Sequence, residues 1–238
     1  MDVKEIDLLG ENIATHWYYR SKAKAITKLL SGRRAQRILD VGAGSGFFSR
    51  YLLSESGALE AWCVDTSYDE DRDSSQAGKP LHFRRTIDSA PADVVLLMDV
   101  LEHVGDDVGL LREYAAKVPD TATFLISVPA FQWLWSAHDV FLEHKRRYTL
   151  SQITHVAERA GLCVERGVYY FGAVFPIAVA TRVLERAFNR GEKQPKSQLK
   201  KHNPFVNGIL ESLCQMELAA LKHNRLAGLT AFCLARTK

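Results

Sequence analysis

The chain has 238 residues, of which 47% are hydrophobic and 25% charged, and its formal net charge is +3 at pH 7. This composition favours one sizeable globular domain and gives no reason to expect a nucleic-acid partner. Four scattered cysteines without a C-x-x-C pair argue against a disulfide framework or a metal site, and they suit a cytoplasmic protein. The acidic first residues are not expected to form a signal peptide, and the longest uncharged run is too short to cross a bilayer.

Strand and helix patterns alternate along most of the chain. Residues 13–30 follow a helical pattern that ends at Gly32. Thr149 and Gln152 have the spacing of a capping box before a helix over residues 150–160, which Gly161 closes. Strands are expected at residues 37–41, 59–65, 81–86, 92–100, 121–128, 162–171 and 228–236, with further helices at residues 47–55 and 106–118. This alternation predicts an α/β fold with an open, doubly wound, mostly parallel sheet of seven strands.

Residues 175–224 depart from this rhythm. Two helical stretches, residues 178–188 and 206–222, are joined by the polar, basic connector NRGEKQPKSQLKKHNP. We therefore predict a helical insertion before the last strand, which acts as a mobile lid. Because its apolar helices have basic flanks, peripheral contact with a membrane surface is a second expectation.

The stretch ILDVGAGSGFFSRYLL carries the strongest motif. It places a glycine loop, Gly42-x-Gly44-x-Gly46, between a strand and a helix, as a nucleotide-type loop requires. The dinucleotide pattern G-x-G-x-x-G would need glycine where Phe47 stands, and Asp40 ends the strand just before the loop. A carboxylate there would repel a pyrophosphate but suits a cofactor with a positive end. These details disfavour a nicotinamide-dependent oxidoreductase.

A second acid, Asp65, closes the second strand. A carboxylate at this place can accept hydrogen bonds from both hydroxyls of a ribose. Together with Asp40, it indicates a cofactor that has a ribose, no phosphate and a cationic group. S-adenosylmethionine meets all three conditions.

The chain resembles the class I S-adenosylmethionine-dependent methyltransferases, above all the ubiquinone-biosynthesis-like small-molecule branch. The motifs that carry the resemblance are ILDVGAGSG, VDTS, DVVLLMDVLEHVGD, ISVPA and HKRRYTLSQITHVAERAGL. They cover residues 37–170, and the last strand also fits. The resemblance implies a Rossmann-like methyltransferase fold as a single domain over residues 1–238, with residues 1–34 as an N-terminal helical cap and residues 175–224 as the insertion.

The resemblance also implies which residues hold the cofactor. The glycine loop would approach the methionine part, Asp40 would face its ammonium, and Asp65 would hold the ribose. The adenine amino group would meet Asp88 or its neighbour Ile87. The cap would contribute Trp17, one of Tyr18 and Tyr19, and Arg20, although Trp17 could equally anchor the helix in the core. The implied cofactor contacts are Asp40, Gly42, Gly44, Gly46, Asp65, Asp88, Met98, Asp99, Trp17 and Arg20, whereas His103 is expected to pack inside the fold.

The segment FQWLWSAHDVFLEHKRRY, residues 131–148, leaves the fifth strand beside the place of the methyl group, so we predict that it forms the acceptor wall. Its tryptophans exclude water and tolerate a cation. A base within hydrogen-bond reach would speed transfer to a hydroxyl, and His138 is favoured over His144 because it lies closer to the strand end. Asp139 would orient one of them. Acceptor contacts are predicted for Trp133, Trp135, Arg146, Arg147 and Tyr148, with a lock between loop and helix as the alternative for Arg147 and Tyr148.

These features favour a methyltransferase acting on the hydroxyl or carboxyl group of a small, partly hydrophobic or lipid-linked molecule. A protein lysine methyltransferase is the first alternative, but the basic connector does not favour a cationic peptide. A cofactor-binding protein without catalysis is a further alternative. The pattern does not determine the acceptor or the oligomeric state.

Overall fold

A computed structural model of the protein describes residues 10–188 and 203–237. Its centre is one eight-stranded sheet with the order β3-β4-β2-β1-β5-β6-β8-β7. The four central pairings, from β4 to β6, are parallel, and the three outer pairings are antiparallel. The strands are β1 (Arg37–Val41), β2 (Glu60–Val64), β3 (Arg72–Gln76), β4 (Lys79–Arg84), β5 (Val94–Met98), β6 (Thr123–Pro129), β7 (Cys163–Tyr170) and β8 (Thr230–Arg236). The predicted doubly wound, mostly parallel α/β sheet is confirmed.

The predicted count of seven strands is wrong, because β3 adds an eighth at the edge. Its sequence, RDSSQ, is almost entirely exposed and has no apolar residue, so no hydrophobic pattern marks it. It pairs with β4 through a hairpin whose two turn residues, Ala77 and Gly78, have φ of 51° and 73°. Positive φ at both central residues is the geometry of a tight type I′ hairpin turn.

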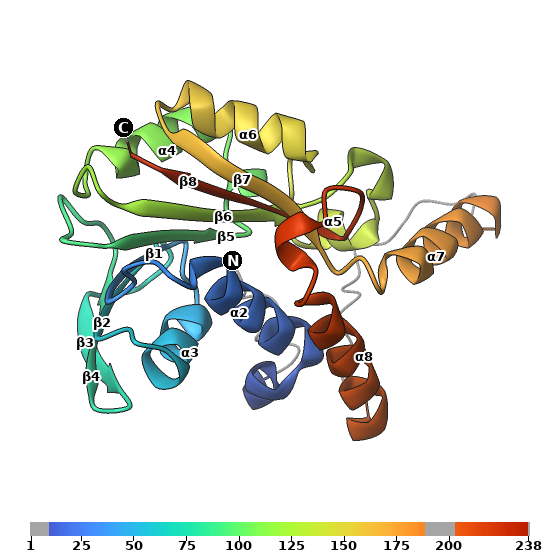
Figure 1. The fold of residues 1–238 in the computed structure, drawn as a ribbon, viewed down its shortest axis with the longest axis horizontal. Coiled ribbons are helices and arrows are strands. Elements are labelled where there is room, and N and C mark those ends of the chain that lie inside the picture. Colours follow the sequence, from blue (N-terminus) through green and yellow to red (C-terminus); the bar gives the residue numbers. More distant parts are fainter. Residues whose placement is uncertain (1–9, 189–202, 238) are drawn as a thin grey trace.

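Helices cover both faces of the sheet (Figure 1). One face is packed by α2 (Trp17–Leu30) and α3 (Phe47–Glu55), and the other by α4 (Asp107–Ala115) and α6 (Leu150–Arg159). β5 is buried along its whole length, which explains its uninterrupted apolar sequence VVLLM. The three layers therefore enclose two hydrophobic cores, one on each side of the sheet.

Local signals place the ends of α6 as predicted. The Thr149 side chain accepts a hydrogen bond from the backbone N–H of Gln152, and the Gln152 side chain accepts one from the backbone N–H of Thr149. Gly161 follows the helix with a φ of 93°. The predicted capping box is confirmed.

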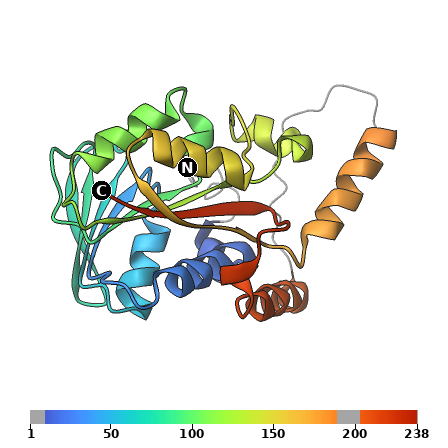
Figure 2. The same cartoon turned by 45° about the horizontal axis from the view of Figure 1, so that its top comes forward.

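Two helices lie between β7 and β8, namely α7 (Phe175–Phe188) and α8 (Pro204–Glu217). The predicted connector between them falls largely outside the described residues. α8 packs on α2, because Glu211 pairs with Lys24 at 2.8 Å and the Asn207 side chain accepts from the backbone N–H of Trp17 at 2.9 Å. α7 extends away from the sheet (Figure 2). Movement of this segment as a lid stays a prediction.

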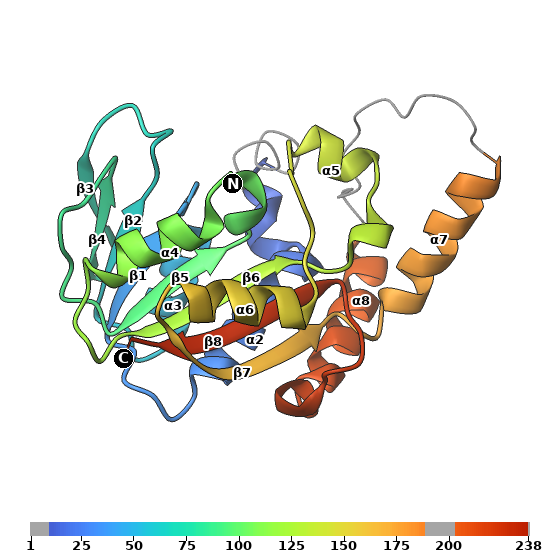
Figure 3. The ribbon, with the colours of Figure 1, turned by 90° about the horizontal axis from the view of Figure 1, so that it is seen from above.

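The parallel strands set the position of the candidate site. The strand order reverses between β1 and β5. From β1 the sheet continues through β2 and β4, and from β5 it continues in the opposite direction through β6. In such sheets, ligands bind at this point beyond the carboxyl ends of the strands. The short helices η3 (Gln132–Leu134) and α5 (Ala137–Phe141) follow β6 at this end, and Figure 3 shows α5 from above. Within the described part of the chain, no helix is both long and apolar enough to cross a bilayer.

Candidate functional site

The glycine loop turns sharply between β1 and α3. Gly42, Gly44 and Gly46 have φ of 66°, 54° and 73°, in the left-handed region that favours glycine. A Cβ at Gly42 would lie 2.8 Å from a methyl carbon of Val100, and one at Gly46 would lie 3.1 Å from the Cys63 sulfur. Side chains at these positions would push the loop off the ends of β2 and β5. The loop therefore keeps bare backbone at the point where the strand order reverses.

Two carboxylates flank this loop. Asp40 is the residue before the last of β1, is 2% exposed, and accepts a hydrogen bond from the Ser49 hydroxyl at 2.9 Å. Asp65 follows β2 and accepts from the backbone N–H of Gly44 at 2.9 Å and from the Ser67 hydroxyl at 2.7 Å. Partial burial would raise the pKa of Asp65, but the hydrogen bonds from Ser67 and Gly44 outweigh it and lower that pKa. Asp65 is thus an anion joined directly to the glycine loop.

Asp99 follows β5 and pairs with a lysine that sequence reasoning missed. The Lys22 ammonium, from α2, forms an ion pair with Asp99, and the Lys22 side chain is fully buried. The hydroxyls of Ser127 and Tyr18 also lie within hydrogen-bond distance of Asp99, at 3.1 and 3.4 Å. A signal was available, since Lys22 lies among the apolar positions Ala25, Ile26 and Leu29 on the buried face of the helix.

The two cap residues predicted for the cofactor, Trp17 and Arg20, both have partners within the protein. Trp17 is 9% exposed and packs edge-on against Phe171, with ring centroids 5.7 Å apart. Arg20 pairs with Glu211 of α8 at 3.3 Å, and its side chain is 43% exposed. Trp17 thus packs in the core at the start of α2 and Arg20 joins α2 to α8, and contact of either residue with the cofactor stays a prediction.

Two further predicted cofactor residues differ in burial. Met98 is 4% exposed at the end of β5, whereas Asp88 is exposed in the loop after β4. A hollow of about 510 Å³ lies at the ends of β2 and β4, lined by Thr66, Asp69, Glu70, Asp71, Arg85 and Thr86. Asp88 does not line this hollow, so the predicted contact between Asp88 and the adenine amino group of the cofactor stays a prediction.

In the segment 131–148, Asp139 is the centre of a buried hydrogen-bond network. Its carboxylate closes a capping box with Ser136 at the start of α5 and accepts from the Arg147 guanidinium at 2.6 and 2.9 Å. His144 Nδ1 lies 2.9 Å from the same carboxylate. Burial would raise the pKa of Asp139, but the hydrogen bonds from His144 and Arg147 lower it strongly. Asp139 is therefore ionised, so Nδ1 of His144 must carry the hydrogen between them.

This network decides which histidine Asp139 orients. The Asp139 carboxylate holds Nδ1 of His144, so Nε2 lies on the side of the ring away from Asp139. The His144 side chain is 6% exposed. His138 is the second residue of α5, next to Asp139, and burial lowers its pKa to about 4. The prediction favoured His138 because of its distance along the chain from the strand. The structure instead gives His144 the arrangement of an oriented imidazole.

The predicted acceptor contacts have different surroundings. Trp133 is 46% exposed and packs edge-on against Phe175 of α7 at 5.9 Å, and Trp135 is partly exposed. The Tyr148 hydroxyl donates to Asp107 at 2.8 Å and is buried, and Arg146 pairs with Asp107 at 3.2 Å. Arg147, as shown above, clamps Asp139. Tyr148 and Arg146 therefore join this segment to α4, and Arg147 joins it to α5, whereas the predicted contacts with the acceptor stay predictions.

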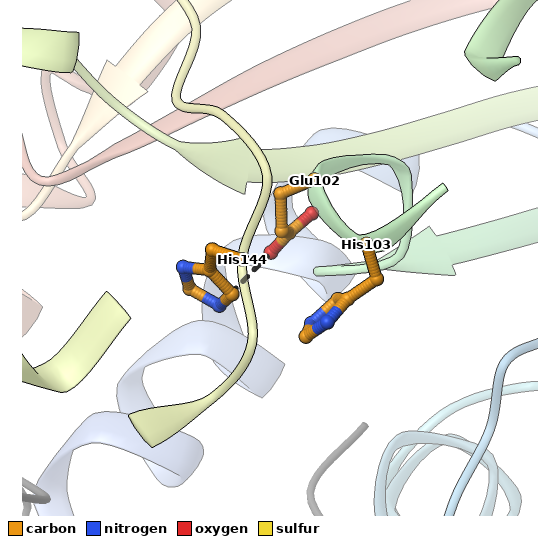
Figure 4. A group of neighbouring side chains, drawn as sticks. All are labelled: Glu102, His103 and His144. Carbon is orange, nitrogen blue, oxygen red and sulfur yellow. Dashed lines mark ion pairs between the residues drawn. The ribbon is translucent and has the colours of Figure 1, made fainter. Parts of the chain in front are cut away.

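Three side chains that share no sequence motif lie close together beside the Asp139 network. Glu102 and His103 come from η2 (Leu101–His103), and His144 approaches from the segment after α5 (Figure 4). The rings of His103 and His144 meet edge-on with centroids 4.8 Å apart. Burial lowers the pKa of His103 to about 4. Burial and the nearby Asp99 raise the pKa of Glu102 well above its ordinary value.

A family model described as "Methyltransferase domain" matches residues 14–166, more than half of the 238-residue chain. No curated protein matches the sequence at a significant level. The fold is similar to phosphoethanolamine N-methyltransferase 2 of Haemonchus contortus in complex with S-adenosyl-L-methionine, with 17% identity and a TM-score of 0.57 over 98% of this chain and 56% of that one.

A second similar structure is a SAM dependent methyltransferase from Archaeoglobus fulgidus, with 16% identity and a TM-score of 0.53 over 91% of this chain and 93% of that one. At such low identity these likenesses show a shared fold. The family match covers the glycine loop, both flanking acids and the segment 131–148. The chain therefore belongs to the methyltransferase-domain family, and its fold is shared with solved S-adenosylmethionine-dependent methyltransferases.

Proposed function

We propose that this methyltransferase transfers the methyl group of S-adenosylmethionine to a hydroxyl or carboxyl group of a small, partly hydrophobic molecule. The observation that carries the proposal is the pair of Asp139 and His144, 2.9 Å apart, beyond the carboxyl ends of β5 and β6. An oxygen nucleophile gains from a neighbouring group that removes or stabilises its proton. A phenolic or carboxylic acceptor would suit the ubiquinone-biosynthesis-like branch that the sequence resembles.

The residues at the glycine loop fit the cofactor. The bare backbone of Gly42 and Gly44 lets a ligand approach closely, and the ionised Asp65 accepts hydrogen bonds from ribose hydroxyls. Asp40 offers a negative charge at the end of β1 that suits the ammonium group. When bound, S-adenosylmethionine supplies a methyl group on a cationic sulfur, which is already activated for displacement. The chain's own part is then to orient the acceptor and exclude water.

His144 is the group that we assign to the acceptor. Its Nδ1 donates to the ionised Asp139, so in the neutral ring the lone pair is on Nε2. That atom lies 3.9 Å from the carboxyl group of Glu102, which comes from η2 just after β5. His138 is less suited, because a pKa of about 4 makes it a weak base near neutral pH.

We expect His144→Ala to lower turnover by about a hundredfold or more, because it removes the oriented imidazole. Its affinity for S-adenosylhomocysteine should stay within about twofold, since the glycine loop and Asp65 are untouched. His138→Ala is the matched control and should keep most of the turnover. The assay follows radiolabelled methyl transfer from S-adenosylmethionine to a panel of phenols, aliphatic alcohols, carboxylic acids, amines and lysine peptides.

Two results of this assay would contradict the proposal. Transfer to amines or lysine peptides alone would exclude an oxygen acceptor and support the lysine alternative. An equal loss in the two histidine variants, with a matching drop in melting temperature, would reduce His144 to a structural residue.

The apolar character of the acceptor rests on α7 and α8. Several large apolar side chains on these helices are more than 40% exposed, namely Ile177, Val183, Leu184, Phe205, Ile209 and Met216. Such side chains suit contact with a lipid-linked acceptor at a membrane surface. We expect the protein to sediment with anionic vesicles at low salt, and Val183→Glu with Leu184→Glu to reduce this. Failure of the unmodified protein to sediment would remove the membrane part of the proposal and leave the methyl transfer intact.

A further inference from the structure

We propose that Glu102, His103 and His144 form a binding site for one divalent transition-metal ion. Each residue offers one ligand atom, and the three atoms lie within 4.8 Å of one another. Figure 4 shows the three side chains converging from two separate segments of the chain. No sequence motif marks this site, because His144 is far from the other two residues along the chain and only folding brings it to them.

The main evidence for a ligand at this place is the burial of Glu102 without hydrogen-bond partners. Its side chain is 0% exposed, and among the described residues neither carboxylate oxygen has a hydrogen-bond partner. His144 Nε2, at 3.9 Å, is beyond hydrogen-bond distance. A buried carboxylate without partners is costly, and native proteins satisfy such groups with a donor, water or a metal ion. The two imidazoles beside it are metal ligands when neutral, so they complete a set of three.

The neighbouring cations are engaged elsewhere. The Lys22 ammonium pairs with Asp99, and the Arg147 guanidinium is held by both carboxylate oxygens of Asp139. Neither donates a hydrogen bond to Glu102 within the described part of the chain. A positive charge placed between Glu102 and the histidines would therefore stabilise the ionised form of Glu102, whose carboxyl oxygens have no hydrogen-bond partner among the described residues.

Asp139 supplies the support that a metal-bound histidine needs. A ligating imidazole usually donates its second N–H to a carboxylate, which fixes the tautomer and the orientation of the ring. His144 donates from Nδ1 to Asp139 at 2.9 Å, so Nε2 is the atom left to bind. In a tetrahedral site with bonds of about 2.1 Å, the ligand atoms are roughly 3–3.5 Å apart. Side-chain rotations that move the ligand atoms by about an ångström would bring the three atoms to that spacing.

The ligand types select the ion. Two nitrogen ligands and one carboxylate suit Zn²⁺, Co²⁺, Mn²⁺ or Fe²⁺ better than Mg²⁺ or Ca²⁺, which prefer oxygen alone. Three protein ligands leave a position open for a further molecule. An acceptor hydroxyl at that position would lose its proton to solvent more easily. Its oxygen would then bond to the methyl carbon while the carbon–sulfur bond breaks, with both electrons remaining on sulfur.

This inference rests on the proposed function and deepens it, since an oxygen acceptor is what such an ion would activate. With the ion bound, His144 Nε2 holds the ion instead of taking the acceptor's proton, and that proton goes to solvent. The test of binding, however, needs no acceptor. The protein is stripped with a chelator and titrated with Co²⁺, followed by calorimetry and visible absorption. We expect one equivalent to bind, with a spectrum of nitrogen and oxygen ligands and no thiolate band.

Glu102→Gln and His103→Ala should each weaken Co²⁺ binding by about a hundredfold or more, since each removes a ligand. Glu102→Gln also keeps the shape of the side chain, which guards against a folding defect. His155→Ala removes an exposed histidine on α6 and should bind as the unmodified protein does. No binding to the unmodified protein, or equal binding in all three variants, would overturn the site.

Turnover then separates this inference from the proposed function. Transfer to an oxygen acceptor that a chelator leaves unchanged would overturn the metal site as part of the reaction while keeping the proposed function. One-equivalent Co²⁺ binding that depends on Glu102, together with transfer to amines alone, would support the site and contradict the oxygen acceptor.

Discussion

Replacing Asp99 by Asn is expected to lower the free energy of unfolding by about 3 kcal/mol. The Lys22 side chain is fully buried and its ammonium pairs with Asp99, so the variant leaves a buried positive charge without its carboxylate. Breaking a buried ion pair in this way typically costs about 3–5 kcal/mol. We take the lower value because the Asp99 side chain is itself 28% exposed. Asn suits the site because Asp99 has a φ of 57°, which Asn also adopts.

Thermal unfolding followed by circular dichroism measures this effect. For a chain of this length, about 3 kcal/mol corresponds to a fall in melting temperature of roughly 6–12 °C. Adding Lys22→Met to Asp99→Asn should recover most of the loss, because both charges are then gone. Glu113→Gln breaks the exposed pair of Glu113 and Lys117, and its effect should stay below about 0.5 kcal/mol. An unchanged melting temperature in Asp99→Asn would show that the ammonium does not depend on Asp99.

The sheet could be predicted because its parallel strands are buried on both faces. Strands of this kind have continuous apolar sequences, such as VVLLM in β5, and helices with clear amphipathic patterns alternate with them. β3 could not be found in the same way. It is an exposed edge strand without apolar residues, and the turn at Ala77 and Gly78 folds it back onto β4, with which it pairs along its length.

The site was predictable where a motif is local in the chain. The glycine loop and Asp65 follow directly from strand ends, and the structure joins them through one hydrogen bond, from the Gly44 N–H to the Asp65 carboxylate. Lys22 and Glu102 were missed because each acts through partners far away in sequence. Both side chains become buried only when α2, η2 and the segment after α5 meet in the fold. The hydrogen bond between Asp139 and His144 also forms only in the folded chain.

Replacing Asp65 by Ala should weaken cofactor binding by at least about a hundredfold. The carboxylate is the group that we expect to accept both ribose hydroxyls, and each charge-assisted hydrogen bond is worth about 1.5–3 kcal/mol. Losing both corresponds to two or more factors of ten in the dissociation constant. Asp120→Ala is the matched control, since Asp120 is exposed in the loop before β6, at the opposite ends of the parallel strands. It should bind the cofactor as the unmodified protein does.

Calorimetric titration with S-adenosylmethionine, S-adenosylhomocysteine and NADH tests the central claim most directly. The structure predicts that the unmodified protein binds the first two at one site, that Asp65→Ala binds both at least about a hundredfold more weakly, and that NADH gives no heat of binding. Tight binding of NADH with no response to S-adenosylmethionine would contradict the assignment of the glycine loop and Asp65 to a methyltransferase cofactor.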